Sequence, residues 1–137
     1  MRLFFSTVIL LLSLSSNAHA FSGGDLYKKC KPFADRAFEA KTIDDLSCVT
    51  YFRGIADGGY RLCLVLKGLI TMSGVTRDDK DAYEAVMINE GLGATNADQL
   101  LPAIQMFVNE MAAEPEKWKG SAVFVTHKSL KKVAPCE

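Results

Sequence analysis

Four cysteines, at positions 30, 48, 63 and 136, constrain this 137-residue chain more than any other feature. An even number of cysteines in a small chain is typical of an exported protein, in which disulfides supplement a limited hydrophobic core. Zinc sites built from cysteine need closely spaced Cys-x-x-Cys pairs, and no two of these cysteines are that close. The pattern therefore predicts two disulfides and no metal site.

The positions of the cysteines limit how they can pair. Cys48 and Cys63 are expected on one helix, where they would lie about 22 Å apart at 1.5 Å per residue. A disulfide needs Cα atoms within about 7 Å, so this pairing is excluded. Two connectivities remain, and we favour Cys30–Cys48 with Cys63–Cys136, since the second bridge would fix the C-terminus.

The N-terminus has the pattern of an export signal. Arg2 is followed by an apolar run over residues 3–14, and Ala18-His19-Ala20 matches the small-x-small cleavage pattern. The run is shorter than the roughly 20 apolar residues that a transmembrane helix requires. We therefore expect residues 1–20 to be a signal peptide cleaved after Ala20, and residues 21–137 to form a single domain.

The charge balance excludes several classes of partner. Lysines and arginines equal aspartates and glutamates in number, so the formal net charge is zero. Binding of nucleic acid needs clustered positive charge, and so does binding to an anionic membrane surface. We expect neither a nucleic-acid partner nor a membrane partner after signal cleavage.

Beyond residue 20 the apolar residues recur every three or four positions, which is the period of an amphipathic helix. This period predicts an all-α bundle of about five helices, stapled by two disulfides. Between the helices we expect a turn at 42–47, a break at 69–76 and a loop at 90–95. For residues 123–126, a short strand is an alternative to helix. The expected helices span residues 25–40, 47–67, 78–89, 96–111 and 115–133.

The central predicted helix contains Gly54, Gly58 and Gly59, each of which costs helix stability relative to alanine. Small residues on a central helix indicate that a neighbouring helix packs closely against them. We expect all three to lie at such a contact.

Catalytic groups are scarce, so we predict no enzyme, no catalytic residue, no metal and no cofactor. His127 is the only histidine after residue 20, and no serine or cysteine triad can be assembled around it. Acidic residues at 78–81 suit the first turn of a helix better than a metal site. Arg53, Asp57 and Arg61 follow at steps of four, which is typical of a solvated helix face.

The residues around the cysteines form three motifs, which are Leu-Tyr-x-x-Cys, then Cys-x-x-Tyr-x-x-Gly-x-x-Asp, and a closing Pro-Cys pair. These motifs resemble those of the Rap/Tai family of type VI secretion immunity proteins. The resemblance covers nearly all of residues 21–137. Outside the cysteines, its motif positions are Tyr27, Tyr51, Gly54, Asp57 and Pro135.

The resemblance implies a periplasmic protein whose partner is a cognate toxin, a peptidoglycan-degrading amidase that it binds and inhibits. The protein could also form a homodimer, and the sequence does not decide its oligomeric state. The chain departs from the family pattern because Cys63 lies inside the helix and residues 68–91 look inserted. We expect this segment to protrude toward the toxin, with Asp78, Asp79 and Tyr83 as contacts. The alternative is that it is a third bundle helix with a solvated acidic end.

A second hypothesis is a periplasmic acid-stress chaperone or another small secreted helical binding protein. A chaperone of this kind exposes apolar surface on acidification. With so few histidines, any such switch would titrate near pH 4 through carboxylates.

Overall fold

The computed structural model describes residues 21–93 and 96–136, so the predicted signal peptide lies outside the described residues. The all-α prediction is confirmed, because the described residues form five α-helices, a short 3₁₀ helix and no strand. Two isolated β-bridges join Ser22 to Ser121 and Leu92 to Pro135.

Helix α2 (Gly23–Asp35) begins after Ser22, whose side chain caps it by accepting a hydrogen bond from the backbone. We predicted that this helix continues to residue 40, which is wrong. Ala37 and Phe38 have φ angles of 52° and 65°, a left-handed conformation that ends the helix. Phe38 then packs edge-on against Phe33, with ring centroids 5.3 Å apart.

Helix α3 (Ile43–Thr71) is the longest element, about 43 Å at 1.5 Å per residue. It begins where we predicted a turn, because Thr42 and Asp45 form a capping box. One stripe of α3 is buried as predicted, including Phe52, Ala56 and Leu66.

The remaining helices are α4 (Arg77–Glu90), α5 (Ala97–Ala113) and α6 (Ala122–Val133). Helix α5 opens on the predicted capping box of Asn96 and Gln99. Its apolar stripe reaches the centre of the core, where Phe107 lies 5.5 Å from Phe52 in an edge-on contact.

The single final helix that we predicted over residues 115–133 is two elements. A 3₁₀ helix, η1 (Pro115–Lys119), is separated from α6 by Gly120 and Ser121. The N-terminal segment interrupts the helix here, because Gly23 donates a hydrogen bond to the Gly120 carbonyl and Ala122 donates one to the Phe21 carbonyl. The alternative of a strand at 123–126 is wrong, since these residues are helical.

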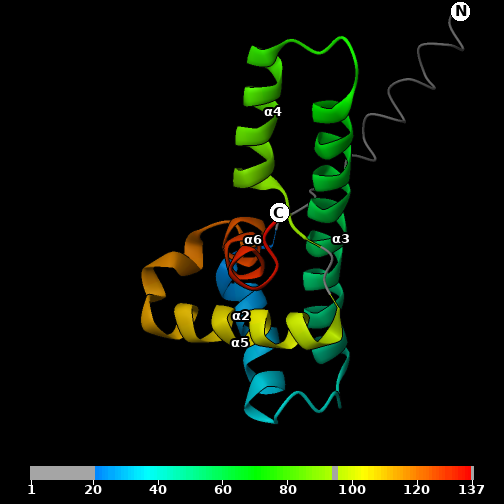
Figure 1. Cartoon of the computed structure of the whole chain (residues 1–137). Coiled ribbons are helices and arrows are strands. Elements are labelled where there is room, and N and C mark those ends of the chain that lie inside the picture. Colours follow the sequence, from blue (N-terminus) through cyan, green and yellow to red (C-terminus); the bar gives the residue numbers. More distant parts are fainter. Residues whose placement is uncertain (1–20, 94–95, 137) are drawn as a thin grey trace, which may run out of the picture.

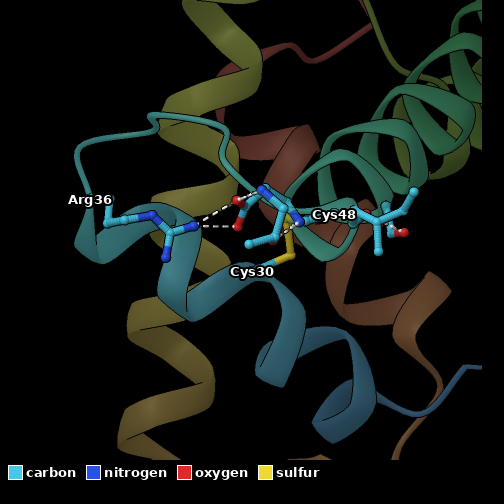
Figure 2. The surroundings of a disulfide bond; sticks show 7 residues. Cys30, Arg36 and Cys48 are labelled. Carbon is cyan, nitrogen blue, oxygen red and sulfur yellow. Dashed lines mark hydrogen bonds and ion pairs between the residues drawn. A yellow bond between two sulfur atoms is a disulfide. The ribbon is translucent and has the colours of Figure 1, made fainter.

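Both favoured disulfides are present. Cys30–Cys48 joins α2 to α3 with Cα atoms 5.2 Å apart, beside Arg36 (Figure 2). Cys63–Cys136 joins the middle of α3 to the C-terminus with Cα atoms 5.9 Å apart. Disulfides of this kind are consistent with an oxidising compartment.

The glycine prediction for α3 holds at one position only. A Cβ added to Gly59 would lie 2.6 Å from the Leu92 side chain, so glycine is required by a close contact. That contact comes from the segment after α4 rather than from a helix. Gly54 and Gly58 were predicted at contacts too, but a Cβ there would meet nothing within 4 Å.

The helices divide into a body and a projection. Helices α2, α5, η1 and α6 gather around the first half of α3, whereas α4 lies antiparallel beside its second half (Figure 1). The body holds the core cluster of buried residues. The second half of α3 and the whole of α4 therefore extend away from that core.

A candidate partner-binding arm

The projection is a two-helix arm, which we define as residues 64–90. Helix α4 packs along α3 and contacts α6 only through its last residues, Asn89 and Glu90, and none of its residues is buried. Within α4 the half-buried positions are Lys80, Tyr83 and Met87, which repeat at helical spacing. One face of α4 thus lies on α3, while the rest is open.

The base of the arm is fixed to the body by several bonds. The Cys63–Cys136 disulfide lies at the point where α3 leaves the body. Beside it, Leu92 donates a backbone hydrogen bond of 3.1 Å to the Gly59 carbonyl. Lys131 of α6 donates a hydrogen bond of 3.0 Å to the Asn89 carbonyl at the end of α4. These contacts hold the arm as a fixed extension of the body.

The tip of the arm carries two exposed carboxylates next to the exposed Arg77. Thr76 caps α4, accepting a hydrogen bond from the Asp79 backbone and donating one of 2.7 Å to the Asp79 carboxylate. Asp78 and Asp79 are exposed in the first turn, where carboxylates favour the helix dipole. The capping role predicted for this acidic run therefore accounts for Asp79.

The structure separates the three predicted contacts. Asp78 and Asp79 lie at the tip, whereas Tyr83 lies further along α4 in the half-buried row beside Lys80 and Met87. The two aspartates are thus open to a partner, and Tyr83 is partly covered.

Apolar side chains on the arm were not singled out from the sequence. Val86 and Ile88 of α4 are 44% and 54% exposed, and Val65 of α3 is 59% exposed. The signal that could have found them is the weak amphipathicity of residues 77–90, in which apolar residues fall on more than one face. Exposed apolar residues on more than one face of α4 are available for contact with a partner protein.

A cluster of charges holds α5, η1 and α6 together in the body. The Glu110 carboxylate accepts hydrogen bonds from Lys128 at 2.8 Å and Lys117 at 2.9 Å. These two ammonium groups outweigh desolvation and lower the pKa of Glu110 to about 2. Hydrogen bonds to Glu114 and to Glu110 raise the pKa of Lys117 in turn. The cluster stabilises the body, and none of its residues lies in the arm.

The family-motif residues differ in how deeply they are buried. Tyr27 is buried, with its ring 5.1 Å from Trp118, and Pro135 follows α6 at the bridge to Leu92. Tyr51 is half-buried, its ring 5.9 Å from Phe21, and burial raises the pKa of its hydroxyl. Gly54 and Asp57 are exposed on α3.

The only described histidine, His127, lies in a shallow hollow at the base of the arm. Its Nε2 is 2.9 Å from the Glu90 carbonyl oxygen, and the hollow is also lined by Phe124 and Lys128. Among residues 21–93 and 96–136, no group of three or more histidine, cysteine, aspartate or glutamate side chains could hold a metal ion. His127 thus bonds to a backbone carbonyl at a helix end.

Comparison of the chain with family models, with curated proteins and with solved structures finds no match. Within the described part of the chain, no helix has the length and apolar content needed to cross a membrane.

Proposed function

We propose that this protein is a periplasmic immunity protein that binds and inhibits a peptidoglycan-degrading effector, an amidase, of a type VI secretion system. The proposal is supported by the resemblance of the cysteine motifs to the Rap/Tai family. The observation that carries it is the arm, a two-helix projection fixed at its base by Cys63–Cys136.

The physical argument rests on preorganisation. Blocking an active-site cleft requires an element that enters it without losing much conformational freedom on binding. An arm of two antiparallel helices meets this need, and its tip, residues 72–79, ends in a turn with the carboxylates of Asp78 and Asp79. The exposed apolar residues Val86 and Ile88 would be buried against the walls of the cleft.

The test begins with capture of the partner. Oxidised protein is used to pull down binders from the periplasm and medium of the producing cells, and the captured proteins are identified by mass spectrometry. The captured peptidoglycan hydrolase is then expressed. Its cleavage of purified peptidoglycan is measured with increasing amounts of this protein. Loss of cleavage at an equimolar amount is the expected result.

Two valine variants make the test specific for the arm. Val86 on α4 and Val123 on α6 are 44% and 49% exposed, so Val86→Asp and Val123→Asp change matched positions. We expect Val86→Asp to weaken inhibition at least about tenfold, because a charge is forced into an apolar contact, and Val123→Asp to inhibit normally. Equal inhibition by both variants would show that the arm does not make the inhibitory contact. Capture of many unrelated proteins only at acid pH would instead indicate the chaperone.

A further inference from the structure

The exposed face of α6 gathers positive charge that the overall charge balance conceals. The chain has a formal net charge of zero, yet α6 carries Lys128, Lys131 and Lys132 and contains no aspartate or glutamate. Phe124, Lys128 and Lys131 are four and three residues apart, so they share one line of the helix surface. This face of α6 therefore attracts anions.

The same face presents an aromatic ring to solvent. Among the described residues, Phe124 is the most exposed aromatic side chain, at 75%. Exposure of so large an apolar group to water is unfavourable, and the ring contributes little to the core of the body. The face of an aromatic ring carries partial negative charge, which attracts polarised C–H groups such as those on the flat side of a sugar. Phe124 is thus available to pack against a ligand.

Phe124 forms one wall of the hollow at the base of the arm, between α6 and the end of α4. The hollow has a volume of about 330 Å³. This volume lies at the lower end of the range of about 300–1,000 Å³ that is typical of small-molecule sites, so the hollow suits one or two rings rather than a folded domain. Its lining residues are Asn89, Glu90, Phe124, His127, Lys128 and Lys131.

The two lysines of the hollow keep hydrogen-bonding capacity for a ligand. Lys128 donates one hydrogen bond to the Glu110 carboxylate, and Lys131 donates one to the Asn89 carbonyl. An ammonium group has three N–H donors, and its hydrogen bonds to a carboxylate are strengthened by charge. Glu90 is the one acidic residue of the lining, so the two lysines leave the hollow with net positive charge.

We propose that this hollow binds a muropeptide, a fragment of peptidoglycan in which an amino sugar carries a short peptide with free carboxylates. The sugar packs on Phe124, and a carboxylate of the peptide accepts hydrogen bonds from Lys128 and Lys131. The inference rests on the proposed function for the compartment alone, since peptidoglycan lies in the periplasm. Helix α4 has 14 residues and so separates the hollow from the tip of the arm by about 20 Å. Binding here would hold the protein beside the substrate of the effector.

The test is a titration of the oxidised, nitrogen-15-labelled protein with a purified disaccharide–tetrapeptide, followed by NMR up to about 10 mM ligand, which spans millimolar affinities. Chemical-shift changes are expected at residues 124–131 and 89–90, with a dissociation constant on the order of 1 mM. Two further probes separate the contributions. Chitobiose supplies the sugar without a carboxylate, and the free tetrapeptide supplies carboxylates without the sugar. Each should bind at least about tenfold more weakly, because each lacks one of the two contacts.

Paired variants make the test specific for the hollow. Lys128 and Lys132 both lie within 4 Å of Glu110 and have the same side-chain exposure of 49%, but only Lys128 lines the hollow. We expect Lys128→Gln to weaken binding about tenfold and Lys132→Gln to bind as the wild type does. In the same way Phe124→Ala should weaken binding, whereas Val123→Ala, 49% exposed and outside the lining, should not.

Three results would overturn the proposal. These are a muropeptide that causes no shift changes at the hollow up to about 10 mM, a Phe124→Ala variant that binds normally, and equal weakening by Lys128→Gln and Lys132→Gln, which would show only a general attraction of anions. Binding of the free tetrapeptide as tight as that of the muropeptide would also exclude the sugar contact. The hydrolase assay keeps this inference distinct from the proposed function, because Phe124→Ala should still inhibit the hydrolase. A wild type that binds muropeptide and inhibits no hydrolase would reject the proposed function alone.

Discussion

Arg36 donates hydrogen bonds of 2.6 Å from one guanidinium nitrogen to both carboxylate oxygens of Asp45, a side chain that is only 1% exposed. Burial by itself would raise the pKa of Asp45. Hydrogen bonds from the backbone N–H groups of Lys41 and Thr42, together with Arg36, outweigh that effect and hold the pKa at about 2. The turn between α2 and α3 is thus organised around one carboxylate.

This carboxylate makes stability depend on pH in a defined window. A carboxyl group whose pKa is lowered by folding stabilises the folded state above its unfolded pKa of about 3.9, and this stabilisation is lost as the pH falls toward 2. We expect Asp45→Asn to lower the Tm by about 5–10 °C at pH 7. The difference from wild type should shrink between pH 4 and pH 2, as measured by circular dichroism melts.

The control for this prediction is Asp81→Asn, an exposed carboxylate on α4, whose melts should follow those of the wild type at every pH. A constant gap between Asp45→Asn and wild type from pH 7 to pH 2 would contradict the assigned role of the Asp45 charge.

The two disulfides should differ in their contribution to stability. In the chain-entropy view a bridge stabilises more when it closes a longer loop, which gives about 3 kcal/mol for the 18-residue separation and about 4 kcal/mol for the 73-residue one. Removing Cys63–Cys136 with paired serines should therefore lower the free energy of unfolding more than removing Cys30–Cys48. Urea denaturation of the two double variants measures this, and the reverse order would contradict it.

Adjacent glycines on α3 should respond in opposite directions to alanine. Gly59→Ala places a Cβ 2.6 Å from Leu92, so we expect it to lower the free energy of unfolding by about 1–3 kcal/mol. Gly58→Ala adds a Cβ in open space and should raise it by about 0.5–1 kcal/mol through helix propensity. Urea denaturation at low protein concentration compares them, and destabilisation by both would show that Gly58 has an unrecognised contact.

The arm should exchange its amide hydrogens before the body does. Helix α4 has no buried residue and packs along α3 alone for most of its length, whereas α5 contributes Ile104 and Phe107 to the core. Local opening therefore costs less in α4 than in α5. Hydrogen exchange read by mass spectrometry should show faster uptake in residues 77–90 than in residues 97–113. Equal protection would mean that the arm is as stable as the body.

Periodicity and capping residues were sufficient to predict most helices. The stripe of α5 and its cap at Asn96 followed from spacing alone, since local chemistry decides them. Two helix ends depend on contacts that periodicity does not show. Phe38 turns left-handed where it packs against Phe33, earlier on the same segment. The 115–133 helix is interrupted at Gly120, where Gly23 donates a hydrogen bond to Gly120 and Ala122 donates one to Phe21, and these partners lie far apart in the sequence.

The candidate site was predictable only in outline. The segment 68–91 was expected to protrude, and the acidic residues Asp78 and Asp79 lie at its tip. The exposed valine and isoleucine of α4 were missed, because exposure of an apolar residue depends on what packs beside it. For the same reason Gly54 was expected at an internal contact and instead faces solvent.

The separations of the cysteines also set an order of events. A chain that enters the oxidising compartment N-terminus first brings Cys30 and Cys48 together after a separation of 18 residues. Cys63 can form its disulfide only after Cys136 has entered, 73 residues later and after α4, α5 and α6. On this order of entry, which holds if the chain is exported as proposed, residues 64–90 arrive before the bond that anchors them, and Cys63 has no disulfide partner until Cys136 arrives.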